Sequence, residues 1–343
     1  MRLKLENIGM ISHADIRLDG LTVIAGENDT GKSTAGKIIF SLVYALNCYE
    51  EDFNESKYTR ISELIENTYF QLRKNYNFDE HKELQKEFVP RNLFRELKES
   101  KGFEVKLIEK KINLLEKTND TKAIDQLKSI KIILQKNEDK STIIKTVLTK
   151  ILASEFYFEL TPKISGLASL ISLSEGLNNI LDINISSNEI SSLTLHDNLS
   201  FNDVTFIETP VFLQMYDLIS SAFSLFEILG NKNKSDRPKI TLHNKDLLLK
   251  LKNAQYHDLI GLNKNEEIIV EDIYNIINGK GFSFEPEEKD FYFNKDENTK
   301  FKSINTATGL KSFGMIQLLI QANVLNERSL LIIDEPEIHL HPK

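Results

Sequence analysis

The amino-acid sequence predicts an α/β protein whose mixed sheet is interrupted by an inserted helical subdomain. A β-branched run at residues 21–25 precedes a glycine-rich loop and an apolar helix at residues 32–46. A second apolar run, at residues 330–333, lies near the other end of the chain. Between the two, the sequence is rich in Lys, Glu, Asn and Leu, with apolar residues at helical spacing.

The first elements follow from residue alternation and turn signals. Residues 2–6 alternate polar and apolar, which predicts a half-buried strand, and a second strand is expected at about residues 14–18. Asp19 and Gly20 then mark a turn. We expect the run at 21–25 to be a buried central strand. The helix at 32–46 is apolar on most faces and should be buried as well.

The middle of the chain is expected to be a helical insertion over residues 48–180, flanked by two parts of one domain at 1–47 and 181–343. Ile108, Ile112 and Leu115 show the helical spacing, but heptads are not sustained, so no long coiled-coil arm is expected. Beyond the insertion we expect strands at 192–195, 204–207, 281–284, 291–293, 301–304 and 330–333, helices at 211–229, 271–278 and 312–325, and a polar loop at 231–237.

Composition limits the classes of partner. The net charge of −8 over 343 residues argues against a surface that coats nucleic acid everywhere. Residues 101–150 hold 12 Lys against 7 Asp and Glu; a solvated helical face is the favoured interpretation, and a nucleic-acid contact is the alternative. Cys48 is the single cysteine, as suits a reducing cytoplasm. No apolar run approaches the roughly 20 residues of a membrane span, so we expect a cytoplasmic protein with no membrane partner.

A phosphate-binding loop is predicted at Gly26-x-x-x-x-Gly31-Lys32-Ser33. The glycines let backbone N–H groups wrap around phosphates, and the dipole of the following helix faces them. Lys32 is expected to reach the β and γ phosphates of ATP, and the Ser33 hydroxyl to coordinate Mg²⁺. The predicted nucleotide-binding residues of this segment are Asn28, Thr30, Gly31, Lys32, Ser33 and Thr34.

Two carboxylates follow the apolar run at 330–333. A buried parallel strand that ends in Asp lies beside the phosphate loop in this architecture. Asp334 is then expected to hold Mg²⁺, and Glu335 to polarise the attacking water. His339 and His341 have no third His or Cys nearby, so we expect them to shape the following loop and not to bind zinc.

A glycine turn precedes the last predicted helix. Thr308 and Gly309 stand about 25 residues before Asp334, and a hydroxyl residue with a glycine at a helix start forms an anion site. Lys311 adds positive charge. The alternative is an ordinary helix start, capped by Thr308 or Ser312.

The order of phosphate loop, insertion, glycine turn, helix and acidic strand resembles the ABC-type ATPase heads of the SMC, RecF and OLD superfamily. Residues 307–314 (ATGLKSFG) and 334–342 (DEPEIHLHP) resemble the OLD-like branch in particular, which includes the PtuA-type anti-phage ATPases of Septu and retron systems. The similarity is specific over about residues 1–47 and 300–343.

This resemblance implies that ATP is sandwiched between two heads in a dimer or a higher homo-oligomer. Thr308, Gly309 and Lys311 of one chain would complete the site formed by Lys32, Ser33, Asp334 and Glu335 of the other. It further implies that ATP-driven association gates a partner effector, a nuclease subunit, in bacterial defence against phage. Glu208 or Gln214 would take the place of the glutamine lid of such heads.

The chain also departs from that family's pattern. Asp29 stands where a Gly is common, and Lys311 stands where the transporter-type signature has Gln. These heads continue through another helix and strand beyond the position of Lys343. We therefore expect that the sequence is part of a longer chain or that a partner chain completes the sheet.

Other functions remain as alternatives. One is a DNA-repair or SMC-like ATPase whose Lys-rich insertion holds DNA, with an affinity that falls steeply with salt. Another is a non-hydrolysing, ATP-dependent scaffold for a partner nuclease, in which Glu335→Gln changes little. A transporter motor fits the long insertion poorly. The sequence shows no His-Asn-His arrangement and no acidic metal cluster apart from Asp334 and Glu335, so no nuclease activity of its own is expected.

Overall fold

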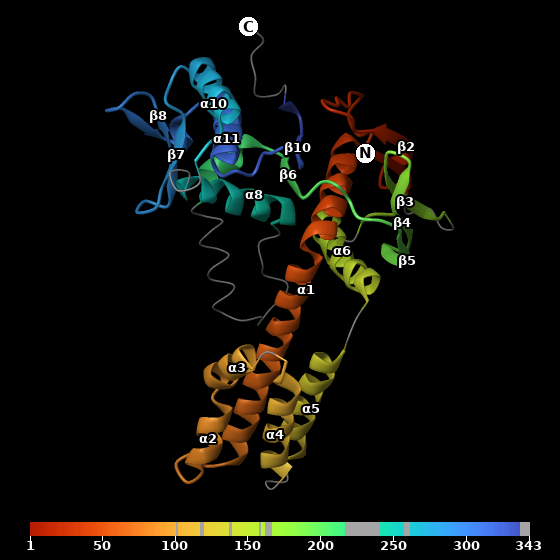
Figure 1. The fold of residues 1–343 in the computed structure, drawn as a ribbon, viewed down its shortest axis with the longest axis vertical. Helices are drawn as coiled ribbons and strands as arrows, with labels where there is room; N and C mark the ends of the chain where they lie inside the picture. The colour runs from red at the N-terminus through yellow and green to blue at the C-terminus, as the bar shows by residue number, and fades with distance from the viewer. Residues whose placement is uncertain are drawn as a thin grey trace. The chain divides into compact units, whose positions relative to one another are not determined.

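The chain divides into two compact units in the computed structural model (Figure 1). We name residues Met1–Asn47 and Leu148–Lys343 the sheet unit, and residues Cys48–Val147 the helical unit. Helices α1 (Lys32–Asn75) and α6 (Lys140–Phe156) have residues in both. The structure describes all residues except 101, 117–119, 137–138, 158, 162–166, 217–239, 257–260 and 337–343, and the side chains of 51, 52, 55 and 56.

The helical unit has a core of its own. It is formed by the later turns of α1 with α2 (Lys82–Phe88), α3 (Pro90–Glu99), α4 (Glu104–Glu116) and α5 (Thr121–Gln135). Ile108, Ile112 and Leu115 are buried in this core, which confirms the helical spacing in α4. The insertion is shorter than the expected 48–180: α6 ends at Phe156, and strands of the sheet unit follow it.

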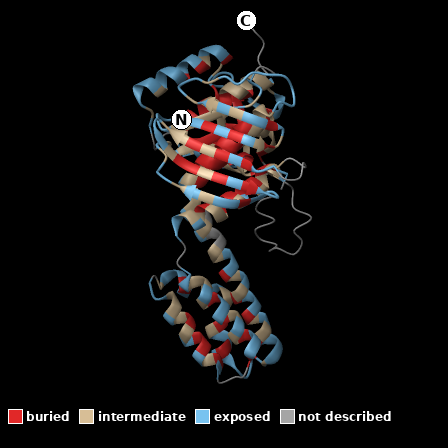
Figure 2. Cartoon of the chain, turned by 90° about the vertical axis from the view of Figure 1, so that its right-hand side faces the viewer, coloured by how far each residue is buried: buried red, intermediate tan, exposed pale blue. Residues whose placement is uncertain are grey.

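The largest sheet is antiparallel, in the order β2-β1-β3-β4-β5. Its strands are β1 (Arg2–Ile8), β2 (Ile11–Arg17), β3 (Ser169–Glu175), β4 (Asn178–Ser186) and β5 (Glu189–Leu195). Buried and exposed residues alternate along β1, and Figure 2 shows this banding across the sheet. The strands expected at 2–6, 14–18 and 192–195 are confirmed, whereas β3 and β4 were not predicted.

Two further sheets lie in the described part of the sheet unit. Strands β6 (Asp203–Ile207) and β10 (Ser329–Ile333) pair in parallel, with Ile333 opposite Ile207. Strands β7 (Phe282–Glu285), β8 (Asp290–Asn294) and β9 (Lys300–Lys302) form an antiparallel sheet. The core beside it includes residues of α8 (Leu242–Asn253), α10 (Lys264–Ile277) and α11 (Thr308–Gln321). The described residues also form short 3₁₀ helices at Pro210–Met215, Ala254–Tyr256 and Ser303–Asn305.

The predicted central strand at residues 21–25 is wrong. The segment has no strand structure, and the side chains of Leu21 and Val23 are 94% and 79% exposed. Among the described residues β10 has one neighbour, β6, and no strand pairs with 21–25. Without hydrogen-bond partners, a β-branched run does not become a strand.

The remaining predictions have mixed outcomes. Strands at 204–207, 281–284, 291–293 and 301–304, and helices at 271–278 and 312–325, are confirmed with shifted ends. The strand at 330–333 exists but is only partly buried, and Ile333 is 38% exposed. Of the helix expected at 211–229, residues Pro210–Met215 form a 3₁₀ helix. The rest of it, and the loop at 231–237, lie outside the described residues, and α8 was not predicted.

Candidate functional site

Helix α1 runs antiparallel to β6 and β10, as two contacts far apart along the helix show. A Cβ atom at Gly36 would lie 2.9 Å from the Phe206 ring and 3.4 Å from Ile332. The Asn47 side chain donates a hydrogen bond to the carbonyl of Phe201 at 3.1 Å. Eleven helical residues and five strand residues both span about 16 Å. The start of α1 therefore lies at the carboxyl end of β6 and β10.

The backbone of the glycine-rich loop before α1 requires a glycine at position 31. Gly31 has a φ of 92°, and a Cβ atom there would lie 2.4 Å from Cγ1 of Ile11. Lys32 Nζ donates hydrogen bonds to the carbonyls of Gly26 (2.9 Å) and Glu27 (2.6 Å). Thr30 Oγ1 donates to the same Glu27 carbonyl at 2.8 Å. The Lys32 side chain thus folds back and links the start of the loop to the start of α1.

The loop and the first turn of α1 are open to solvent. Residues 26–30, including Asn28 and Asp29, are exposed, while Gly31, Lys32, Ser33 and Thr34 are half-buried. The first N–H groups of a helix have no partner within the helix, and the helix dipole favours an anion beside them. This end of α1 is therefore suited to bind a phosphate group.

Asp334 and Glu335 follow β10 at the same edge. The backbone N–H of Asp334 extends the parallel ladder by donating to the Ile207 carbonyl at 2.9 Å. Glu335 adopts a positive φ of 46°, so the chain turns sharply after the strand. A mostly apolar pocket of about 60 Å³ adjoins both acidic residues, and Ser312 and Phe313 of α11 also line it.

The glycine turn opens α11, but its lysine faces inward. Thr308 and Gly309 are half-buried at the first turn of the helix. Lys311 is 3% exposed, and its ammonium group donates to Oε1 of Gln214; burial lowers the pKa of this lysine. Two residues that were each expected to contact nucleotide are thus bonded to each other within one chain.

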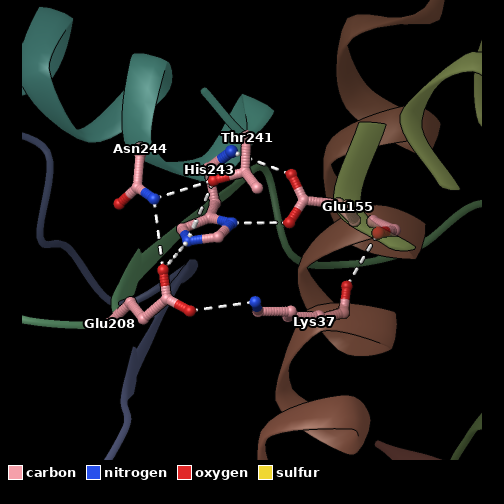
Figure 3. A network of polar contacts seen from close by, with 7 residues as sticks. Lys37, Glu155, Glu208, Thr241, His243 and Asn244 are labelled. Atoms are coloured by element: carbon pink, nitrogen blue, oxygen red, sulfur yellow. Dashed lines mark hydrogen bonds and ion pairs between the residues drawn. The ribbon is translucent and has the colours of Figure 1, made fainter. Parts of the chain in front are cut away.

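Glu208, the other candidate for the lid, lies in a network of polar groups (Figure 3). Its Oε1 is 2.9 Å from Nζ of Lys37 on α1, and its Oε2 is 3.1 Å from Nε2 of His243 on α8. Asn244 donates to the same Oε2 at 3.2 Å. The opposite ring nitrogen of His243 is 2.5 Å from Oε2 of Glu155 on α6, and the His243 backbone N–H donates to Oε1 at 3.1 Å.

The contacts of this network favour a charged imidazole. The side chains of His243 and Glu155 are fully buried, and both ring nitrogens face carboxyl oxygens, so both ring nitrogens donate when the two carboxylates are ionised. Burial lowers the pKa of His243, but the hydrogen bonds to Glu155 and Glu208 outweigh it and raise that pKa above its ordinary value. The His243 hydrogen bond, ahead of Lys37, holds the pKa of Glu208 far below its ordinary range. Two positive and two negative groups balance.

Sequence reasoning identified Glu208 here but missed Lys37, Glu155, His243 and Asn244. Lys37 lies within the predicted helix and stands directly before its apolar run, which begins at Ile38, and this is a weak signal. His243 lies 88 positions from Glu155 and 35 from Glu208, so no local spacing relates them. Only the packing of α1, α6, α8 and β6 brings these groups together.

The described part of the chain contains no group of three or more His, Cys, Asp or Glu side chains arranged to hold a metal ion. His339 and His341 lie outside that part. Ser33 and Asp334 supply a hydroxyl and a carboxylate oxygen at neighbouring element ends, and oxygen atoms are the ligands that Mg²⁺ prefers. None of the described helices is both long and apolar enough to span a bilayer.

Comparison of the chain with family models, curated proteins and solved structures finds no significant match in any of the three.

Proposed function

We propose that this chain binds and hydrolyses Mg-ATP, as the ABC-type, OLD-like ATPase heads that it resembles do. The observation that carries the proposal is the shared edge: the glycine-rich start of α1 and the carboxylates after β10 lie at the same end of a parallel strand pair. Ligands of α/β sheets bind at this carboxyl end of the strands. The mixed α/β content agrees with the expected class, and the P-loop NTPase fold is part of the proposal.

Each residue has a defined role in this proposal. The N–H groups at the start of α1 bind the phosphates, and Lys32 leaves the Gly26 and Glu27 carbonyls to contact the β and γ phosphates. Ser33 and Asp334 hold Mg²⁺, which neutralises charge on the phosphates. Glu335 orients and polarises the attacking water.

We further propose, from the resemblance, that ATP binding drives association of two heads and that this association gates an effector subunit in anti-phage defence. Thr308 and Gly309 would complete the site of the partner head. Lys311 would join them only after it releases Gln214, because its ammonium group is buried in the free chain.

The first test is binding and hydrolysis of Mg-ATP by the wild type and three variants. Lys32→Ala should abolish binding, because it removes the cation at the phosphates. Glu335→Gln should bind ATP but lower turnover by about 10²-fold or more, since it lacks the base. Lys4→Ala, which removes an exposed lysine on β1, is the matched control and should behave as wild type.

The outcomes separate the alternatives. Absence of Mg-ATP binding by the folded wild type would overturn the proposal. Binding without turnover in both wild type and Glu335→Gln would instead indicate the non-hydrolysing scaffold. The mass of the protein in solution with and without Mg-ATP, measured on Glu335→Gln, tests the association of heads: an ATP-dependent dimer supports it, and an unchanged monomer contradicts it.

A further inference from the structure

Glu208 lies at the end of β6, beside β10 and the first part of α1. It directly follows Ile207, whose carbonyl accepts the hydrogen bond from the Asp334 backbone. Its side chain reaches Lys37 on α1 at 2.9 Å, just over one turn beyond Ser33. The position of Glu208 therefore affects both the strand end that carries Asp334 and the helix that begins with Lys32.

The His243 ring contacts the Glu208 carboxylate through Nε2, at 3.1 Å. The ring is fully buried, and the rings of Phe40 and Phe206 contact it edge-on at centroid distances of 5.9 and 4.8 Å. The Glu155 carboxylate is hydrogen-bonded to both the ring and the backbone N–H of His243. The imidazole therefore has one orientation, in which Nε2 points at Oε2 of Glu208 (Figure 3).

We propose that His243 is a positioning residue for ATP hydrolysis: anchored by Glu155, it holds the Glu208 carboxylate where β6, β10 and the start of α1 meet. The inference rests on the proposed function. Glu208 is about one-third exposed, so without His243 its carboxylate is free to turn toward solvent and to release Lys37. The hydroxyl of Ser33 and the carboxylate of Asp334 then lose their fixed separation, and Mg²⁺ binding weakens.

The test compares His243→Gln with the wild type in two measurements over a range of Mg²⁺ concentrations, the binding of ATP and its hydrolysis. A glutamine has one donor end and one acceptor end, so it cannot donate to both Glu155 and Glu208. We expect the Mg²⁺ concentration at half-maximal rate to rise about tenfold or more, as for other groups that orient metal ligands, with a lower kcat. Glu155→Gln, which leaves the ring in place, should shift the same quantity in the same direction by less.

Two matched variants separate positioning from general stability. Phe40→Leu removes a ring that packs against His243 but leaves every hydrogen bond of the network. It should lower the free energy of unfolding while leaving the Mg²⁺ dependence close to wild type. In the double variant Glu155→Gln, His243→Gln the two introduced amides can pair with each other while the one at position 243 still donates to Glu208. Its activity should therefore exceed that of His243→Gln alone.

Each outcome decides the question. If His243→Gln keeps the Mg²⁺ dependence of the wild type, or if Phe40→Leu shifts it equally, His243 has only a structural role and the inference fails. In either case binding and turnover by the wild type leave the proposed function intact. If the folded wild type binds no Mg-ATP, the proposed function fails and this inference fails with it.

Discussion

His243 and Glu155 are 88 positions apart in the chain, yet they form the most enclosed charge pair at the candidate site. Lys32 and Asp334, in contrast, belong to contiguous sequence motifs, so the sequence alone predicts that they lie near each other. A pair such as His243 and Glu155 depends on tertiary packing alone, so neither residue could be identified before the structure.

The protonated state of His243 makes stability depend on pH. Its folded-state pKa is raised, whereas an unfolded His has a pKa of about 6.5. The stabilisation is therefore complete below about pH 6.5 and is lost as the pH rises through the folded-state value. The groups facing the ring are Glu155 from α6, Glu208 after β6, and Thr241 and Asp246 with α8.

We expect the difference in unfolding free energy between wild type and His243→Gln to be largest near pH 6 and to shrink in alkaline solution. Chemical denaturation at a series of pH values measures it. Glu208, whose folded pKa is depressed, contributes the opposite trend only in acid, so the two effects occupy separate pH ranges. A difference that grows from pH 6 to pH 9 would contradict a charged His243.

At the scale of elements, the spacing of apolar residues correctly predicted which face of a strand or helix is buried. The alternation in β1 and the helical spacing in α4 correspond to faces that the structure buries. The run at 21–25 is also rich in β-branched residues, but among the described residues no strand lies beside it, and the run is exposed. High β propensity favours an extended backbone, but a strand also requires a neighbouring backbone with which to form hydrogen bonds.

The packing of α1 on the parallel strand pair leads to a prediction at Gly36. Alanine there should favour the helix by about 1 kcal/mol on propensity alone. Its Cβ would, however, lie 2.9 Å from the Phe206 ring, and overpacking costs about 1–3 kcal/mol. We expect Gly36→Ala to lower the free energy of unfolding and to weaken Mg-ATP binding.

Phe206→Leu in the same chain serves as the control for Gly36→Ala. It removes the ring that the new methyl group meets, so the double variant should lose less stability than the two single changes together. Equilibrium denaturation of the four proteins measures this coupling. A neutral or stabilising Gly36→Ala would show that α1 does not pack closely on β6.

For the whole molecule, the α/β class with a helical insertion could be predicted, but the end of the insertion could not. Helical and strand composition change gradually between Phe156 and Ser169, so the sequence gives no sharp boundary there. Contacts in the structure end the helical unit earlier, at Val147 within α6, because residues Cys48–Val147 have a core separate from that of the sheet unit.

Separate cores predict separate responses to mutation. Leu127 on α5 is fully buried in the helical unit, and Leu127→Ala should cost about 2–5 kcal/mol there. We expect the Mg-ATP affinity of this variant to stay at the wild-type value, since the candidate site belongs to the sheet unit. Hydrogen exchange should show the loss of protection within the helical unit, residues Cys48–Val147, and not in the sheet unit. Equal loss in β1 and β6 would indicate one cooperative structure.

The neutral set of Lys37, Glu155, His243 and Glu208 also has an evolutionary consequence. A charge-changing substitution at either fully buried residue, Glu155 or His243, leaves an unpaired charge in a region with little water, whereas a second substitution at the other residue restores neutrality. We therefore expect substitutions at Glu155 and His243 to occur together in related chains. The four residues therefore act as one electrostatic unit, although they are scattered along the sequence between positions 37 and 243.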